Sequence, residues 1–485
     1  MDDSAHTPPS PEALEQLLLG EAVSRLSREV SDIRKDLDGR IEFNARQLRF
    51  MRQSVDRMRL DRQVRRLPNA TRQAMRRALG RRAPEGAVGE RHATPLIPWQ
   101  HSSASTLLIV AHAYPLDLRS YGGQPLARRL PHYIDAGHHV VVFIPTKGEA
   151  TDQIAPDGVR VVVSDLNHLN EVAREIGATQ LLIHSPTPEI WAHAKPLSAL
   201  MPTHTWMHGF ESRSWRELGF DFTAQEVEER SPRMDAYDTE KRKVLAEILS
   251  APEITSIFVS SFLQQVAEQF AGCAASNAHV IHNIIDLEAF PYRARTAADR
   301  FRVTSVRSFN KRNYGTDLLT LAIRELRSQP WFDELAIRII GDGRYFDEDT
   351  SELSNLPNVS LERHFVGPND LSRVLSQSGI ALLPTRWDSQ GMMMGESMAS
   401  GLVPVTNGVA AIPEFVDAES GILAGDGDYK GLADGIAALV DDPNRYLELS
   451  RGAFARVKAQ CHVGVTVAAE LELIANAKQD ANVRS

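Results

Sequence analysis

Short runs of aliphatic and β-branched residues alternate with amphipathic stretches over most of the chain. Each run is bounded by polar or turn-forming residues, which is typical of buried parallel strands separated by helices. The first series of expected strands spans 105–113, 138–146, 159–166, 179–186, 202–209 and 256–262. The second spans 301–309, 335–343, 360–367, 380–385 and 402–407. This alternation predicts two doubly wound α/β domains.

The pattern is different in residues 1–85, where a helical arm is expected. Apolar positions recur there at alternating spacings of four and three, with a phase slip at Gly39. Such a seam is typical of a coiled coil. We expect a homo-oligomer that assembles through residues 14–60. The alternative is a helical hairpin that folds onto the body of the same chain.

The second half of this arm is rich in arginine. Residues 46–82 contain thirteen arginines and two aspartates. A basic helix of this kind can lie on anionic lipid headgroups, because each basic side chain near the surface adds about 1 kcal/mol. It can equally remain solvated or pair with an acidic protein. An anionic membrane surface is therefore one candidate partner.

Composition and charge limit the remaining organisation. Residues 86–104 are rich in Pro and Gly and predict a linker, followed by domains at 105–295 and 296–460 and a C-terminal helix at 461–485. The net charge of −9 argues against a nucleic-acid partner. Two distant cysteines, no signal peptide and no long apolar run lead us to expect a cytoplasmic protein, at most peripheral at the inner face of the membrane.

Candidate site residues follow the expected strands, because ligands bind at the carboxyl ends of open parallel sheets. Gly122 and Gly123 precede a helix after strand 105–113, where backbone amides can approach a phosphate. A plain strand-to-helix turn is the alternative. His208 ends strand 202–209, although a single histidine is more often structural. Its competitors are His112, His184, His193 and His204.

A basic cluster marks the first strand of the second domain. Arg307, Lys311 and Arg312 lie at the end of strand 301–309. Fixed cations at this position can neutralise a diphosphate and stabilise charge on a leaving phosphate. A solvated surface turn is the alternative for this segment taken alone.

Two acids bracket a methionine-rich stretch in TRWDSQGMMMGESMASGLVPVT, residues 385–406. Gly391, Met392 and Met393 fall at the expected start of a helix, where free amides bind phosphate oxygens. Asp388 and Glu396 suit hydroxyl groups on either side of that phosphate. A nucleoside diphosphate sugar meets both needs. The alternative is that the methionines fill the core and Glu396 caps a helix.

These motifs occur together and in order. Seven residues separate Asp388 from Glu396, and Ser-Met-Ala-Ser-Gly-Leu-Val-Pro-Val follows. Other matches are the Gly122-Gly123 pair, His-Gly-Phe-Glu at 208–211, Asn-Ile-Ile-Asp at 283–286, Ile-Ile-Gly-Asp-Gly at 339–343 and Ile-Pro-Glu-Phe-Val at 412–416. In these features the chain resembles, over about residues 105 to 440, the retaining nucleotide-sugar glycosyltransferases of family 4, which have the GT-B fold.

The resemblance implies a role for each matching residue. Gly123 would lie by the donor phosphates, His208 would contact the transferred sugar, and Glu396 would hold the ribose. Arg307 and a lysine near 311 would hold the diphosphate. Two departures stand out. Asp388 replaces the family's first glutamate, and two extra residues precede Gly315, which leaves the lysine's role open between Lys311 and Arg312.

The resemblance implies a retaining, metal-independent glycosyltransferase of the hexosyltransferase type. It would have two Rossmann-like domains facing a cleft and would need no cofactor besides its nucleotide-sugar donor. The acceptor would be a hydroxyl of a glycan, polysaccharide or lipid-linked oligosaccharide. The alternative is a catalytically degenerate GT-B scaffold that acts through its coiled coil in an assembly. A nicotinamide-dependent oxidoreductase is disfavoured, because the chain lacks the GxGxxG fingerprint.

Overall fold

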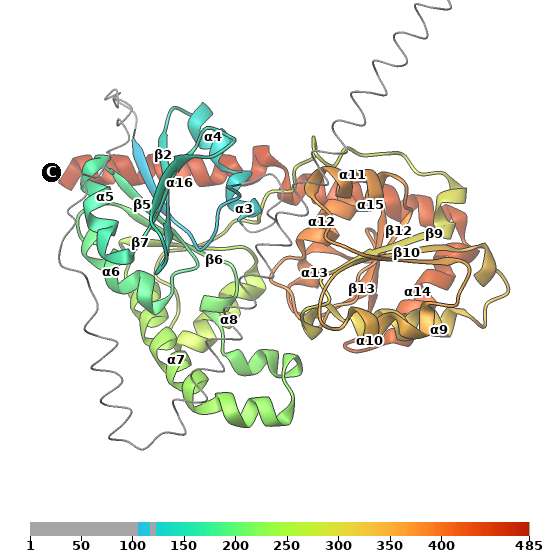
Figure 1. Ribbon diagram of the computed structural model, residues 1–485. Coiled ribbons are helices and arrows are strands. Elements are labelled where there is room, and N and C mark those ends of the chain that lie inside the picture. Colours follow the sequence, from blue (N-terminus) through green and yellow to red (C-terminus); the bar gives the residue numbers. More distant parts are fainter. Residues whose placement is uncertain (1–104, 117–122, 485) are drawn as a thin grey trace, which may run out of the picture. The chain divides into compact units, whose positions relative to one another are not determined.

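The computed structural model describes residues 105–116 and 123–484. The expected coiled coil, the arginine-rich arm, the linker and Gly122 lie outside these residues. The described part contains two α/β lobes (Figure 1). We call them the N-lobe, which holds the first sheet, and the C-lobe, which holds the second.

The N-lobe sheet has the strand order β3-β4-β2-β1-β5-β6-β7-β8. Neighbouring strands pair in parallel, except that β3 runs antiparallel to β4. The strands are β1 (Thr106–Val110), β2 (His139–Pro145), β3 (Thr151–Ile154), β4 (Arg160–Ser164), β5 (Gln180–His184), β6 (Thr203–Met207), β7 (Ile254–Phe258) and β8 (Ala278–Val280). The chain order reverses at β1, whose neighbours are β2 and β5.

Both faces of this sheet are covered. Successive side chains of β1 point to opposite sides, so Leu108 joins one apolar core and Leu107 joins the other. One core is formed with α5 (Leu169–Glu175), α6 (Pro188–Ser198), α7 (Ala224–Ser250) and α8 (Ser261–Ala271). The other is formed with α3 (Gln124–Ala127), α4 (Leu130–Asp135) and α16 (Val463–Arg484).

Helix α16 comes from the end of the chain but packs on the N-lobe sheet (Figure 1). Val467 and Ile474 are buried in the N-lobe core. Glu470, fully buried, accepts a hydrogen bond from Arg129 Nε at 2.7 Å and another from Tyr133 Oη at 2.7 Å. A buried ion pair is stable only when its hydrogen bonds are satisfied. This one fixes where α16 sits.

The C-lobe sheet is wholly parallel, with the order β11-β10-β9-β12-β13-β14. Its strands are β9 (Arg302–Val306), β10 (Ala336–Gly341), β11 (Val359–Arg363), β12 (Ile380–Leu382), β13 (Val403–Asn407) and β14 (Ile422–Ala424). Its helices are α9 (Thr316–Leu326), α10 (Phe346–Thr350), α11 (Pro368–Ser376), α12 (Met392–Ala399), α13 (Ile412–Phe415), α14 (Tyr429–Asp441) and α15 (Pro443–Cys461). Here the order reverses between β9 and β12.

The two predicted Rossmann-like domains are confirmed, with local differences. The strand expected at 256–262 ends at Phe258, because the Ser260 side chain accepts a hydrogen bond from Leu263 N and starts α8. The strand expected at 360–367 ends at Arg363. The short strands β3, β8 and β14 were not predicted, and all four residues of β3 are exposed, so it carries no apolar signal.

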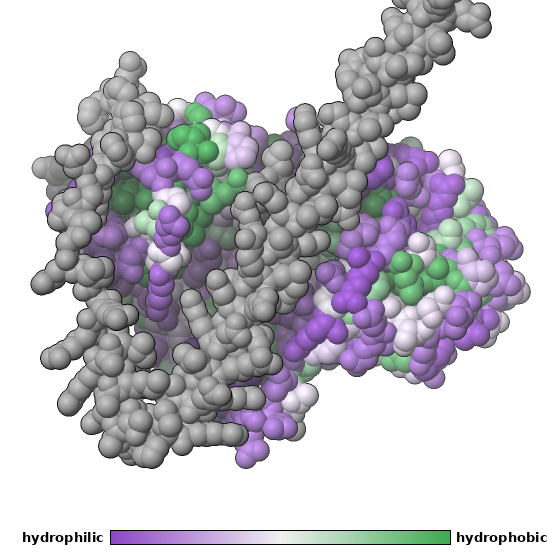
Figure 2. Space-filling view, in the orientation of Figure 1, coloured by the Kyte–Doolittle hydropathy of each residue, from purple (hydrophilic) through white to green (hydrophobic). Residues whose placement is uncertain are grey.

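The visible surface is mostly hydrophilic, with apolar residues in small separate patches (Figure 2). Within the described residues, no helix combines the length and the hydropathy that a bilayer-spanning segment requires.

Candidate active site

Gly123 begins the first candidate segment, immediately before α3. Its φ of 79° is in the left-handed region. A Cβ at this position would lie 2.5 Å from the carbonyl oxygen of Ala113, which follows β1. Only glycine allows this close approach, so the first turn of α3 lies directly over the carboxyl end of β1.

His208 follows β6 and belongs to a tight turn. Gly209, with φ 147°, continues the turn, and the buried carboxylate of Glu211 accepts hydrogen bonds from the backbone N–H groups of His208 and Gly209. His208 Nε2 lies 3.0 Å from Nδ1 of His184, with which it shares a hydrogen bond. The turn thus fixes the position of the imidazole relative to the sheet.

Both imidazoles of this pair are neutral near pH 7. Burial, together with the positive charge of Arg129 and the neighbouring His112, lowers the pKa of His208 to about 3. Burial also lowers the pKa of His184 well below its usual value. A neutral imidazole can donate one hydrogen bond and accept another, which suits contact with a hydroxyl group. The lowered pKa values therefore argue against a protonated histidine in this pair at neutral pH.

Arg307 follows β9 at the point where the C-lobe strand order reverses. Its guanidinium donates hydrogen bonds to the carbonyl oxygens of Leu383 at 3.0 Å and Pro384 at 3.4 Å, which follow β12. The side chain is 9 % exposed and its Cζ lies 5.5 Å from the centroid of the Tyr314 ring. The guanidinium is therefore held between the ends of two neighbouring strands, where α/β sheets bind ligands.

Lys311 and Arg312 have different surroundings. Arg312 forms ion pairs with Asp349 and, at 2.9 Å, with Glu348. Its Cζ lies 3.7 Å from the Tyr345 ring centroid, so the side chain is committed to the C-lobe itself. Lys311 is exposed and lines a cavity of about 280 Å³. Of the two, Lys311 is the cation that a ligand can reach.

Asp388 lies at the start of α12. Its Oδ1 accepts hydrogen bonds from the backbone N–H groups of Gln390 at 3.2 Å and Gly391 at 2.8 Å. Gly391 has φ 79° and precedes the first helical residues, Met392 and Met393, which are half-buried. One carboxylate oxygen therefore shapes the loop, and the helix begins where the sequence predicted.

Glu396 is fully buried in α12 and forms an ion pair across the two lobes. Arg128 Nη2, from the segment between α3 and α4, donates to Glu396 Oε1 at 2.8 Å. The Arg128 side chain is 10 % exposed, and within residues 105–116 and 123–484 its Nη1 has no hydrogen-bond partner. Sequence reasoning missed Arg128, because nothing in the Ala-Arg-Arg-Leu segment distinguishes it from its neighbour Arg129.

The His208 turn also contacts the Asp388 loop. A Cβ on Gly209 would lie 3.2 Å from the Trp387 ring. Arg213 also contacts this loop, since its Cζ lies 3.3 Å from the centroid of the Trp387 ring. Burial lowers the pKa of Arg213 to about 10, although Asp388 and other nearby acids oppose the shift. Sequence reasoning missed Arg213 as well.

Asp221 makes a second connection between the lobes. This N-lobe carboxylate, 5 % exposed, accepts hydrogen bonds from the backbone N–H groups of Arg312 at 2.6 Å and Asn313 at 3.2 Å. It therefore orders the turn that carries Lys311. Contacts between the lobes therefore join Arg128 to Glu396, the His208 turn to the Asp388 loop, and Asp221 to the turn that carries Lys311.

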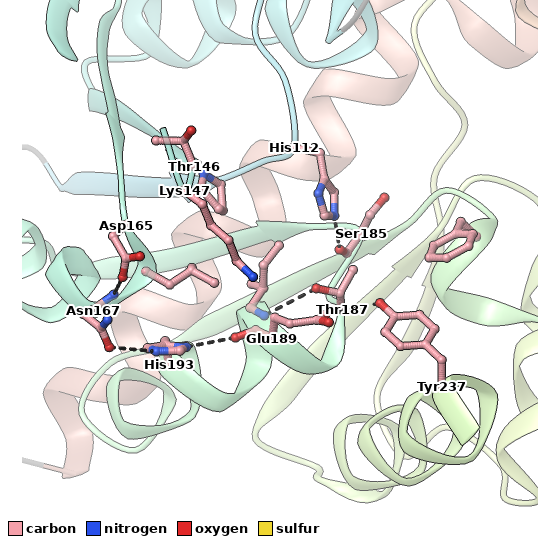
Figure 3. Close-up of a pocket in the computed structure, with 14 residues that line it drawn as sticks. His112, Thr146, Lys147, Asp165, Asn167, Ser185, Thr187, Glu189, His193 and Tyr237 are labelled. Carbon is pink, nitrogen blue, oxygen red and sulfur yellow. Dashed lines mark hydrogen bonds between the residues drawn. The ribbon is translucent and has the colours of Figure 1, made fainter. Parts of the chain in front are cut away.

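A large cavity opens at the carboxyl edge of the N-lobe sheet (Figure 3). Its volume is about 830 Å³. The lining comes from the ends of β1, β2, β4 and β5 and from α6 and α7, and it includes His112, Lys147, Asp165, Glu189 and Tyr237. Among the residues that the structure describes, no group of three His, Cys, Asp or Glu side chains is arranged as a metal site.

Comparison with known proteins supports a glycosyltransferase. Residues 300–442, most of the C-lobe, match the family model "Glycosyl transferases group 1". A curated protein from Klebsiella pneumoniae, described as an uncharacterized 41.2 kDa protein in the cps region, is 24 % identical over 199 residues. That match covers 38 % of this chain, and the chain spans about half of the relative, 53 %.

Solved structures share the fold at low identity. Sucrose-phosphate synthase from Thermosynechococcus elongatus has a TM-score of 0.62 and 14 % identity, with 78 % of this chain and 100 % of that chain covered. Anabaena HepE in complex with UDP and glucose has a TM-score of 0.55 and 15 % identity, with 77 % and 100 % covered. The trehalose-6-phosphate protein of E. coli, bound with UDP-2-fluoro glucose, has a TM-score of 0.55 and 10 % identity, with 76 % and 99 % covered. The fold is GT-B-like, as predicted.

Proposed function

We propose that this chain transfers a sugar from a nucleoside diphosphate sugar to a hydroxyl group of an acceptor, with retention of configuration at the anomeric carbon and without a metal ion. One observation carries the proposal. The reversal point of the C-lobe sheet collects Arg307, the Asp388 loop and the start of α12, within the segment that matches a glycosyl transferase family. HepE, which shares the fold, is described in complex with UDP and glucose, which supports a nucleotide-sugar donor.

Each group has a role that follows from its surroundings. Arg307 and Lys311 supply the positive charge that a diphosphate needs, and the amides of Met392 and Met393 in the first turn of α12 can donate to its oxygens. The Gly391 amide donates to Asp388 and sets the start of that turn. The neutral His208 can hydrogen-bond a sugar hydroxyl. The outer oxygen of Asp388 can do the same, while its inner oxygen holds the loop. Arg312 stabilises the turn through its ion pairs.

The proposed reaction takes place on one face of the sugar. The bond between the anomeric carbon and the β-phosphate oxygen breaks, and a bond from the acceptor oxygen forms on the same side. The acceptor proton passes to the departing phosphate oxygen, so the products are the glycoside and the nucleoside diphosphate. Cations fixed beside the leaving group stabilise its developing charge. The fixed guanidinium of Arg307 meets this requirement without a metal.

One observation favours the alternative of a catalytically degenerate scaffold. Glu396, the expected ribose ligand, is fully buried and already paired with Arg128. A donor must share this carboxylate with Arg128 or displace the guanidinium. Three further points are also proposals. They are assembly through residues 14–60, contact with an anionic membrane, and an acceptor that is a glycan, a polysaccharide or a lipid-linked oligosaccharide.

Two variants test the proposal. His208→Ala should lower UDP release from UDP-glucose by about 100-fold or more, the range seen when a fixed hydrogen-bond donor to the transition state is removed. Glu396→Ala should lower it as well, because the carboxylate that would accept hydrogen bonds from the ribose is lost. Lys195→Ala, an exposed change on α6, is the matched control. Circular dichroism establishes that each variant is folded. Full activity in both variants would refute the site.

A binding experiment distinguishes an active enzyme from a catalytically degenerate scaffold. Calorimetry with UDP and other nucleoside diphosphates measures donor binding apart from turnover. Tight binding by the unaltered chain, with no turnover of any donor in the presence of an acceptor panel, would establish the scaffold instead.

A further inference from the structure

The N-lobe cavity is joined to His208 through two strand ends. Ser185, which follows β5, has a φ of 57°, a strained conformation for a residue with a side chain. Its carbonyl oxygen accepts a hydrogen bond from His112 Nε2 at 3.0 Å, and both residues line the cavity. The preceding residue, His184, holds His208 at 3.0 Å. The wall of the cavity and the imidazole are therefore parts of one hydrogen-bonded unit.

The polar groups of the lining already have fixed orientations. His193 Nδ1 lies 3.0 Å from the carbonyl oxygen of Glu189, and its Nε2 lies 3.3 Å from Oδ1 of Asn167. Asp165 Oδ1 accepts a hydrogen bond from the backbone N–H of Asn167 at 2.9 Å. Figure 3 shows the Lys147 side chain extending into the cavity between these groups. These bonds hold donors and acceptors in place around the space, and a set of hydroxyl groups can use both kinds.

One side of the cavity is aromatic. The rings of Phe210 and Tyr237 lie 6.2 Å apart between centroids, and Phe210 is 49 % exposed. The hydroxyl of Tyr237 donates to Glu189 Oε2 at 3.2 Å. Burial and the Glu189 carboxylate raise the pKa of Tyr237 to about 12, so this hydroxyl stays protonated. An apolar ring face beside fixed polar groups matches the C–H face and the hydroxyls of a sugar ring.

The charges of the side chains that line the cavity favour some kinds of acceptor over others. Among the described residues that line it, Asp165 and Glu189 are carboxylates, Lys147 is the one ammonium, and none is an arginine. A phosphate monoester carries close to two negative charges and would meet both carboxylates at short range. A lipid tail would cover several charged groups without satisfying them. An uncharged polyhydroxylated molecule avoids both penalties.

We infer that this cavity is the acceptor site and that it takes an uncharged carbohydrate, in preference to a sugar phosphate or a lipid. The inference rests on the proposed function and deepens it. The volume of about 830 Å³ lies in the range of small-molecule sites and has room for more than one sugar ring. The hydroxyl that accepts the new bond would face the His184–His208 unit.

Saturation-transfer NMR on the full chain tests this inference. The probes are a panel of neutral mono- to tetrasaccharides, glucose 6-phosphate, and vesicles of phosphatidylcholine and phosphatidylglycerol, each with UDP present. We expect saturation transfer to neutral sugars and at least tenfold weaker binding of glucose 6-phosphate than of glucose. Tyr237→Ala should weaken sugar binding at least tenfold. Lys195→Gln, on the same helix as Glu189 but outside the cavity, should not.

A variant that neutralises two carboxylates tests the role of their charge. Asp165→Asn with Glu189→Gln keeps the shapes of both side chains and removes both charges. In the double variant, the ratio of the Kd of glucose 6-phosphate to the Kd of glucose should be at least fivefold smaller than in the unaltered chain. Preference for the phosphate in the unaltered chain, binding to vesicles alone, or the absence of any sugar binding would each overturn the inference. Equal sugar binding by Tyr237→Ala would do the same.

Failure of this inference is distinguishable from failure of the proposed function. In the proposed function, UDP binding depends on the C-lobe residues and Gly123, none of which lines the cavity, and calorimetry measures it separately. A chain that binds UDP and turns over its donor with a sugar phosphate retains the proposed function and loses only the acceptor class. A chain that binds neither UDP nor any donor loses the proposed function.

Discussion

The buried ion pair between Arg129 and Glu470 allows a quantitative prediction about stability. Both side chains are fully buried, and Arg129 also donates to the carbonyl oxygen of Pro125 at 2.6 Å and to Asn283 Oδ1 at 3.0 Å. The variant Arg129→Leu removes the charge partner and three hydrogen bonds. It leaves Glu470 with the neutral donors Tyr133 and Trp206.

The expected effect follows from the burial of the pair. Removing one partner of a buried ion pair lowers the free energy of unfolding by about 3–5 kcal/mol, because the remaining charge stays desolvated. For a lobe of this size, that loss corresponds to a decrease in Tm of about 10 °C. The double variant Arg129→Leu with Glu470→Leu removes both charges. It should recover about 2 kcal/mol or more relative to Arg129→Leu, because no uncompensated charge remains.

Thermal and urea unfolding, followed by circular dichroism, measure these differences. An exposed pair in the same lobe is the control. Arg216 and Asp235 lie 2.6 Å apart, with side chains 55 % and 45 % exposed, so Arg216→Leu should cost much less stability than Arg129→Leu. If Arg129→Leu and Arg216→Leu lose equal stability, or if the double variant is no better than the single, the reasoning about α16 is refuted.

Three other outcomes are expected. His204 is buried, and burial lowers its pKa to about 4, so the unfolded chain binds more protons than the folded chain between pH 4 and 6.5. This histidine alone should lower stability by about 2 kcal/mol from pH 7 to pH 5, in addition to the effect of His184 and His208, so His204→Gln should reduce the decrease in urea titrations at the two pH values. Gly123→Ala should weaken UDP binding in calorimetry at least tenfold, because a Cβ would meet the Ala113 carbonyl oxygen at 2.5 Å, and unchanged binding would place the donor elsewhere. After dialysis against EDTA, the rate of UDP-glucose turnover should stay within twofold of the untreated rate, since Arg307 and Lys311 supply the cationic charge. A loss of activity that Mg²⁺ restores would contradict the metal-independent proposal.

Much of the candidate site was readable from the sequence, because its residues follow directly on secondary structure. Strand and helix periods are local, so the pattern placed Arg307 at the end of a strand and Met392 at the start of a helix. Parallel sheets then bring strand ends to one edge. By contrast, β3 was missed, because its four residues are exposed and carry no apolar alternation.

The contacts that complete the candidate site could not be predicted from the sequence, because they join residues far apart in the chain. Arg128 and Glu396 are 268 residues apart, and Asp221 and Arg312 are 91 apart. No local period records such pairs. The choice between Lys311 and Arg312 was open for the same reason, and the structure adds that acids of α10 pair with Arg312.

The sequence by itself determined the two α/β lobes and the ends of strands at which chemistry can occur, because hydrophobic periodicity and glycine turns act over a few residues. Only the tertiary structure decided which cations are committed to ion pairs, how α16 returns to the N-lobe, and where the N-lobe cavity opens. Those outcomes depend on packing between distant segments, where burial and charge are balanced over the whole fold.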